Sequence, residues 1–239
     1  MNTSDTLPAQ TSQGPGRWLV NRPQGRPAEC LLLLNHGAGG GLDGIDLVAC
    51  AGMLPARGVI VARFDQPWHV AGKKVATRPP TLDQAFLEAL PVLLDTCEPG
   101  LPLISGGHSA GARVACRTAD QIGARAVVAL SFPLHPPGKP ERSRREELVH
   151  PSCPVLVVQG ERDPFGNGDE VRAALADPEG AKVDGAKVDG AKVEGIKVVD
   201  VEAAAHNLAV AAKVRPATAQ RELLAGVVGE FLAEVIWNS

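Results

Sequence analysis

Short apolar runs alternate along the chain with longer segments of helical length. The six runs are residues 30–35, 58–64, 101–106, 126–132, 154–160 and 196–201. The segments of helical length are residues 44–57, 81–97, 110–122, 169–177 and 217–237. Strands that are apolar throughout are typical of a parallel sheet covered on both faces. The order of these segments therefore predicts an α/β fold, with a doubly wound, mostly parallel sheet and helices on both of its faces.

Two segments lie outside this alternation. Residues 1–16 have neither the positive region nor the apolar region of a secretory signal, so we expect a flexible N-terminal tail. Residues 180–195 repeat GAKVD, GAKVD and GAKVE, and a period of five fits neither a helix nor a strand. We interpret this repeat as a low-complexity insertion without a function of its own, within a single domain of residues 17–239.

Composition narrows the class of protein. The 239 residues carry a formal net charge of −3 and 3% aromatic residues with no Tyr, which argues against a nucleic-acid surface or a carbohydrate platform. The five cysteines show no CxxC pair, which is typical of reduced thiols in the cytoplasm. No apolar run approaches the roughly 20 residues that cross a bilayer. We expect a cytoplasmic protein with a small-molecule partner, no nucleic-acid or membrane partner, and an oligomeric state left open.

The sequence GHSAG at residues 107–111 directly follows the apolar run at 101–106 and opens the helical segment at 110–122. This is the G-x-S-x-G pattern of a nucleophile elbow in its strand–turn–helix setting, with Ser109 on the turn. Gly107 and Gly111 have a steric reason to be glycine, because so sharp a turn leaves no room for a Cβ. The alternative is a glycine-rich turn with an N-cap serine.

Such an elbow requires an acid and then a histidine later in the chain. Only His206 follows the last apolar run, at 196–201. The run at 154–160 leads into Glu161 and Asp163, and we favour Asp163 because the proline after it fixes a turn; Glu161 is the second choice. Ser109, Asp163 and His206 are the predicted catalytic residues.

A glycine-rich loop, NHGAGGG at residues 35–41, follows the first apolar run. We expect the amides of Ala38 and Ala110 to form an oxyanion hole. A phosphate cradle is the other interpretation, although the chain has no G-x-G-x-x-G or G-K-[ST] motif. His36 is expected to brace this loop and His108 to pack under the elbow. No two histidines have the spacing of metal ligands, so we predict neither a metal site nor a cofactor.

Together these residues resemble the α/β-hydrolase superfamily from Trp18 to Trp237. Finer features resemble a hydrolase-like subgroup that includes the third subunit of the nonspecific-lethal histone acetyltransferase complex and small bacterial relatives, often described as dienelactone-hydrolase-like. The matching stretches are Arg63-Phe64 with Pro67, residues 78–80, the proline-rich residues 132–140, and residues 163–166. Two features depart from the pattern: Ser109 stands where true dienelactone hydrolases have cysteine, and AAHN at 204–207 stands where the subgroup usually reads GDHS.

The superfamily usually inserts a cap domain between the strands expected at 126–132 and 154–160. Only residues 133–153 lie there, so we expect no separate cap domain and an open cleft for small or exposed acyl groups. The candidate substrate-binding residues are Gly39, Trp68, His69 and His135. The basic residues Lys139, Arg144 and Arg145 either attract an anionic substrate or form a solvated charged surface.

The resemblance and the residues together imply a serine hydrolase that cleaves an ester or thioester. Two alternatives stay open. Eukaryotic members of the subgroup include scaffold proteins, which would make the chain a non-catalytic interaction protein. The same three residues also support acyl transfer to an acceptor other than water, or a lyase-type step.

Overall fold

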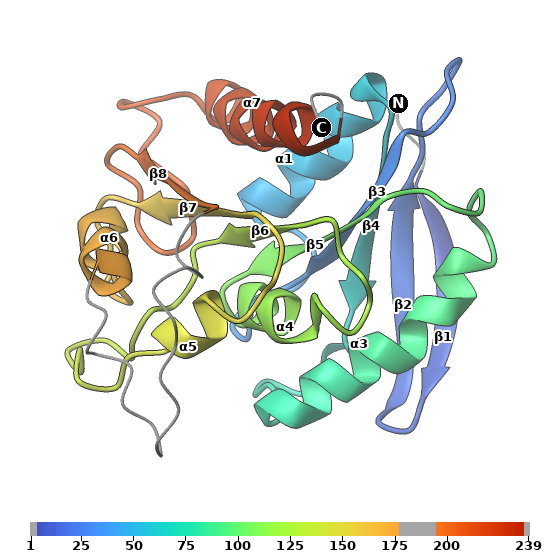
Figure 1. The fold of residues 1–239 in the computed structure, drawn as a ribbon, viewed down its shortest axis with the longest axis horizontal. Helices are drawn as coiled ribbons and strands as arrows, with labels where there is room; N and C mark the ends of the chain where they lie inside the picture. Colours follow the sequence, from blue (N-terminus) through green and yellow to red (C-terminus); the bar gives the residue numbers. More distant parts are fainter. Residues whose placement is uncertain (1–3, 177–194, 237–239) are drawn as a thin grey trace.

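The structure, a computed structural model, describes residues 4–176 and 195–236. An eight-stranded sheet runs through the molecule between two layers of helices (Figure 1). The strands are β1 Asp5–Thr11, β2 Gly14–Asn21, β3 Cys30–Asn35, β4 Val59–Asp65, β5 Leu103–His108, β6 Ala126–Leu130, β7 Val155–Gly160 and β8 Ile196–Val201. The helices are α1 Ile45–Met53, the 3-10 helix η1 Leu54–Arg57, α2 Pro67–Val70, α3 Pro79–Leu94, α4 Ala110–Thr118, α5 Arg145–Leu148, α6 Gly168–Ala176 and α7 Ala217–Ile236.

The strand order is β1-β2-β4-β3-β5-β6-β7-β8, and every pairing from β4 to β8 is parallel. The strand β3 lies between β4 and β5, so the sheet grows from it in both directions and is doubly wound. All six predicted strands are present within about two residues of their expected bounds. The doubly wound, mostly parallel sheet predicted from the sequence is confirmed.

The predicted flexible tail at residues 1–16 is wrong over its described part. Strands β1 and β2 form an antiparallel hairpin there, and β2 continues the sheet by pairing with β4. Trp18 anchors the hairpin: its side chain is fully buried, and its indole N–H donates to the carbonyl of Ala89 at 2.9 Å. The folded domain therefore begins at about Asp5.

No separate cap domain is present in the described chain. Between β6 and β7 the chain forms loops and the single turn of α5, as the short segment predicts. The predicted insertion at 180–195 lies outside the described residues, apart from Gly195.

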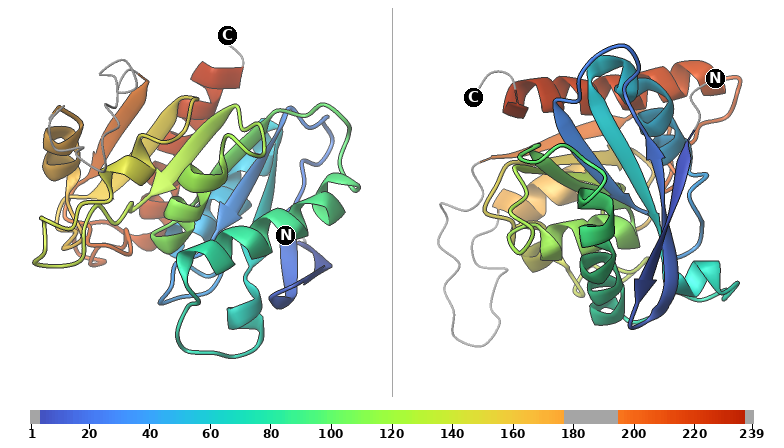
Figure 2. Two further views of the ribbon diagram at one scale, coloured as in Figure 1. Left: turned by 60° about the horizontal axis from the view of Figure 1, so that its bottom comes forward. Right: turned by 90° about the vertical axis from the view of Figure 1, so that its right-hand side faces the viewer.

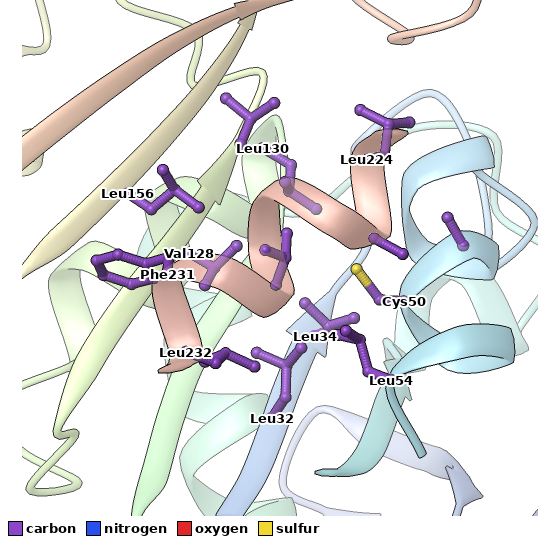
Figure 3. Packing of buried hydrophobic residues seen from close by; sticks show 14 of the residues in the cluster. Leu32, Leu34, Cys50, Leu54, Val128, Leu130, Leu156, Leu224, Phe231 and Leu232 are labelled. Carbon is purple, nitrogen blue, oxygen red and sulfur yellow. The ribbon is translucent and has the colours of Figure 1, made fainter. Parts of the chain in front are cut away.

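Both faces of the sheet are covered by helices, which Figure 2 shows from two further directions. On one face, Leu32 and Val128 of the sheet pack against Phe231 and Leu232 of α7, with Cys50 of α1 beside them (Figure 3). Helices α3, α4, α5 and α6 cover the other face. Each fully buried leucine or phenylalanine stabilises such a layer by about 1.5–3 kcal/mol.

Among the helices of the described residues, none combines the length and the apolar character needed to cross a bilayer.

Candidate active site

Ser109 lies on the sharp turn between β5 and α4. Its backbone has φ 52° and ψ −112°, a conformation that non-glycine residues rarely adopt and that costs about 1–3 kcal/mol. The amide of Ser109 donates to the carbonyl of Leu130 at the end of β6, at 2.9 Å, which holds the turn in place. The predicted strand–turn–helix setting of the elbow is therefore present.

The two glycines of the elbow are required by a close approach of three chain segments. A Cβ on Gly107 would lie 2.5 Å from the carbonyl oxygen of Asn35 and 2.6 Å from the backbone of Gly111. A Cβ on Gly111 would lie 2.1 Å from the same Asn35 oxygen. The glycines thus let α4 lie against the end of β3, and not only against its own strand as the sequence suggested.

Replacing Gly111 is expected to destabilise the fold severely. In Gly111→Ala the new methyl group meets the backbone of β3, which cannot move without disturbing the centre of the sheet, so the free energy of unfolding should fall by more than about 3 kcal/mol. Gly226→Ala in α7 is the control, because a Cβ there meets nothing within 4 Å and should stabilise by up to about 1 kcal/mol. Urea denaturation measures both; equal effects would contradict the close approach.

Ser109, His206 and Asp163 form a continuous hydrogen-bonded chain. Nε2 of His206 lies 2.8 Å from Oγ of Ser109, and Nδ1 of His206 lies 2.8 Å from Oδ2 of Asp163. Each residue follows a different strand, β5, β8 and β7, so the chain assembles where the carboxyl ends of parallel strands meet. The arrangement can move a proton from the serine to the imidazole while the carboxylate holds the ring.

The Asp163 carboxylate is buried and held by three donors. Besides His206, the amide of Phe165 donates to Oδ1 at 2.8 Å, and Nε2 of Gln159 donates to Oδ2 at 3.1 Å. Glu161, the second choice from the sequence, instead accepts the amide N–H of Ala203 at 2.7 Å. The structure therefore brings Asp163, and not Glu161, to the histidine.

Ser109 opens into a cavity of about 490 Å³, a volume suited to a small molecule. The residues that line it are Gly37, Ala38, Gly39, Gly40, Gly41, Gly44, Leu47, His108, Ser109, Ala110, Arg113, Pro133, Arg144, Phe165, His206 and Asn207. No cysteine of the described residues is among them. Burial also raises the pKa of the Cys30 thiol to about 12, together with the charge of Glu29. Ser109 thus carries the only hydroxyl among the described residues that line this cavity.

The predicted oxyanion donors lie at the same cavity. Ala38 and Ala110 both line it, and within the described chain neither amide N–H has a protein acceptor. Ala110 is the first residue of α4, where the amide has no partner inside the helix. Two amides are therefore free to donate to an anion beside Ser109. Gly39, predicted to bind substrate, lines the cavity as well.

Three other predicted substrate-binding residues do not line the cavity. Trp68 is buried behind the glycine-rich loop, with its ring 5.3 Å from that of His36. His69 lies close beneath Gly41 and is hydrogen-bonded through Nδ1 to Asp65 at 2.5 Å. Both residues lie on the short helix α2, and the structure does not bring them to the lining of the cavity.

The third, His135, is buried in the loop after β6. Its Nδ1 lies 3.0 Å from the carbonyl of Pro136, and its Nε2 lies 3.3 Å from the carboxylate of Glu170. Both ring nitrogens thus have protein partners, and the structure does not bring His135 to the lining of the cavity.

His36 braces the glycine-rich loop, as predicted. Its Nε2 accepts the amide N–H of Gln66 at 3.2 Å, and its Nδ1 lies 2.9 Å from the carbonyl of Gly37. Burial lowers its pKa, which favours the neutral ring. With Asp65 and His69 it forms the only group of described residues in which three metal-ligand atoms come within 4.8 Å of one another. Both ring nitrogens of His36 have protein partners, and Nδ1 of His69 is hydrogen-bonded to Asp65, so we interpret the cluster as a hydrogen-bonded support.

His108 lines the cavity instead of packing under the elbow. Its ring centre lies 5.4 Å from that of His206, and its Nδ1 lies 2.7 Å from Oδ2 of Asp46, which is buried in α1. Burial lowers the pKa of His108, but the charge and hydrogen bond of Asp46 outweigh it, so the pKa is raised overall. Sequence reasoning missed Asp46, although an acid inside the apolar segment IDLVAC was a usable signal.

The ion pair of His108 with Asp46 predicts a pH-dependent stability. Because the folded-state pKa of His108 is raised, the pair contributes fully below the unfolded-state pKa of about 6.5, and its contribution is lost as pH rises through the folded-state value. Asp46→Asn should therefore lower the free energy of unfolding by about 1.5–3 kcal/mol in acid, and by much less in alkali. Urea denaturation at about pH 5.5 and about pH 9 measures the difference.

The control for this prediction is the double variant. In a His108→Gln background, Asp46→Asn should lose its pH dependence, because the titrating partner is gone. A destabilisation that is the same at both pH values in the single variant would mean that the interaction is an uncharged hydrogen bond.

Comparison with known proteins identifies a family model that matches this chain and solved structures with a similar fold. A sequence model described as the alpha/beta hydrolase domain matches residues 28–213. Similar solved structures include an α/β serine hydrolase without a lid from Xanthomonas campestris, which is 18% identical with a TM-score of 0.65 over 97% of this chain and 96% of that one. A dienelactone hydrolase from Anabaena variabilis is 17% identical with a TM-score of 0.70, covering 98% of each chain. A thermophilic esterase from Thermogutta terrifontis is 16% identical with a TM-score of 0.69, over 98% of this chain and 92% of that one. At these identities the structures share the α/β-hydrolase fold.

Proposed function

Because this chain belongs to the alpha/beta hydrolase domain family, we propose that it is a serine hydrolase that cleaves an ester or thioester of a small or exposed acyl group. The observation that carries the proposal is the hydrogen-bonded chain of Ser109, His206 and Asp163 at the wall of the cavity. The names of the similar structures, a serine hydrolase, an esterase and a dienelactone hydrolase, support the same class of reaction.

The first half of the reaction acylates the serine. Nε2 of His206 takes the proton of Ser109 as Oγ attacks the substrate carbonyl carbon, from the observed separation of 2.8 Å. The tetrahedral intermediate then collapses, the bond to the leaving alcohol or thiol breaks, and His206 returns the proton to that group. Asp163 keeps the imidazole in the tautomer with its proton on Nδ1 and stabilises the imidazolium.

The oxyanion of the intermediate is held by backbone amides. Ala38 N–H and Ala110 N–H are free to donate to it, and the positive end of the α4 dipole favours negative charge at the same point. Loss of one such donor costs roughly 10²–10³ in rate in serine hydrolases.

The second half of the reaction releases the acyl group. A water molecule attacks the acyl carbon while His206 takes one of its protons, and the bond to Ser109 Oγ breaks as that proton passes to the serine. An alcohol or amine in place of water would make the same residues a transferase. Product analysis with a competing alcohol distinguishes the two outcomes.

The absence of a cap and the cavity volume of about 490 Å³ support small or exposed acyl groups. Within the family we place the chain in the subgroup of the nonspecific-lethal complex subunit and its bacterial relatives. The resemblance of residues 132–140 and 163–166 to that subgroup supports this. Both stretches reach the site, since Pro133 lines the cavity and the ring of Phe165 lies 4.2 Å from that of His206. A cytoplasmic location is part of the proposal and is supported by five free cysteines.

A fluorophosphonate probe tests the proposal directly. The wild-type protein should react covalently with the probe and hydrolyse p-nitrophenyl acetate, and peptide mapping should place the adduct on Ser109. A protein that neither reacts with the probe nor turns over the ester would be a non-catalytic interaction protein.

A further inference from the structure

The cavity beside Ser109 carries positive charge that the protein does not balance. Its lining includes two guanidinium groups, Arg113 and Arg144, and no aspartate or glutamate of the described residues. The two lining histidines, His108 and His206, are each hydrogen-bonded to a buried carboxylate behind them. The partners of the two arginines therefore determine how much positive charge faces the cavity.

Arg113 is part of a balanced cluster. It makes a two-bond contact with Glu147 at 2.8 and 2.6 Å, and Glu147 also pairs with Arg117 at 2.6 Å. Arg117 in turn pairs with Asp83 at 2.7 Å. Two arginines thus face two carboxylates, which fixes the side chain of Arg113 between α4 and α5, two helices that lie side by side (Figure 1).

Arg144 has no such partner. Its Nη1 donates to the carbonyl of Pro133 at 2.7 Å, a neutral acceptor, and among the described residues it forms no ion pair. Its backbone amide donates to the carbonyl of Leu134 at 2.7 Å, so hydrogen bonds hold both the backbone and the guanidinium group of Arg144. The side chain is half-buried; burial and then the charge of Arg113 lower the pKa of Arg144, and the charge of Glu147 offsets this only in part.

We propose that Arg144 binds a carboxylate on the acyl group of the substrate, so that the enzyme prefers monoesters or monothioesters of short dicarboxylic acids. This rests on the proposed function, because it concerns the same cavity. The N–H groups of Arg144 that Pro133 leaves unused match a carboxylate in a two-bond contact. One unbalanced positive charge matches one carboxylate, whereas a phosphate dianion would leave excess negative charge.

A pair of esters that differ in one charge tests the proposal. The substrates are p-nitrophenyl hydrogen adipate and its neutral methyl ester, with the uncatalysed rate subtracted. The wild type should show a kcat/KM about 10- to 100-fold higher for the anionic ester, mainly through a lower KM. Added salt should reduce the preference, because it screens the charge of a half-buried guanidinium.

Arg144→Gln separates charge from loop structure. Glutamine retains an N–H donor for the Pro133 carbonyl but has no charge, so the preference should disappear while the neutral ester is turned over almost as before. Arg142→Gln is the matched control: it removes the same charge from an exposed side chain of the same loop and should keep the preference. An equal loss on both esters in Arg144→Gln would mean that Arg144 only closes the loop, and would overturn the proposal.

The outcomes also separate this proposal from the proposed function. Equal turnover of the two esters by the wild type would leave the serine hydrolase in place and refute the role of Arg144. If neither ester is turned over, binding of monomethyl adipate is measured by calorimetry. Binding by the wild type that Arg144→Gln abolishes would sustain the carboxylate site without the hydrolase, and equal or absent binding would refute it.

Discussion

Ser109→Ala is expected to lower kcat for a p-nitrophenyl ester by about 10⁴- to 10⁶-fold and to abolish labelling by a fluorophosphonate. Among the residues that the structure describes, the substitution removes the only hydroxyl that His206 Nε2 contacts, at 2.8 Å, and it leaves the oxyanion amides in place. A small rate above that of water should therefore remain. Alanine keeps the same backbone constraint at φ 52°, so the melting temperature should barely change.

Ser131→Ala is the matched control for this substitution. Ser131 also has a positive φ, 47°, at the end of the neighbouring strand β6, but it is fully buried and does not line the cavity. Its hydroxyl has no hydrogen-bond partner among the described residues, so its loss should affect neither rate nor labelling. Turnover that survives Ser109→Ala would place the nucleophile elsewhere and refute the proposed mechanism.

The central strands were predictable from the sequence because they are buried on both faces. Each of β3, β4 and β6 is buried along its whole length, so its sequence is mostly apolar, with polar residues only toward the carboxyl ends of β3 (Asn35) and β4 (Arg63 and Asp65). The hairpin of β1 and β2 lies at the edge of the sheet, where alternate positions are exposed and polar. The sequence of the hairpin is therefore as polar as that of a typical loop, and Pro8 and Gly16 make a strand still harder to predict.

The residues of the site also differ in how far the sequence could predict their positions. That Ser109, Asp163 and His206 come together was predictable because each lies in the turn or loop after a strand whose end the topology fixes. That Trp68 does not line the cavity could not be predicted, because the direction of a side chain depends on the turn after a strand, here the short helix α2. Asp46 contacts His108 across 62 positions of sequence, a pairing that no local pattern contains.

Asp163→Asn is expected to lower kcat by about 10⁴-fold while the fold stays intact. The carboxylate of Asp163 accepts three hydrogen bonds, and an amide has only one oxygen to offer. With that oxygen kept on the amide N–H of Phe165, the new NH₂ group faces His206. The imidazole must then present a lone pair at Nδ1 and carry its proton on Nε2, where it cannot accept the proton of Ser109.

Glu161→Gln is the control, since it makes the same acid-to-amide change two residues away. Its side chain keeps an acceptor for the amide N–H of Ala203, and the rate should be unchanged. Steady-state kinetics of both variants on one p-nitrophenyl ester, with melting curves beside them, decide between the two acids. A large loss in Glu161→Gln with little in Asp163→Asn would reverse the assignment, because it would mean that Glu161 orients His206 during turnover.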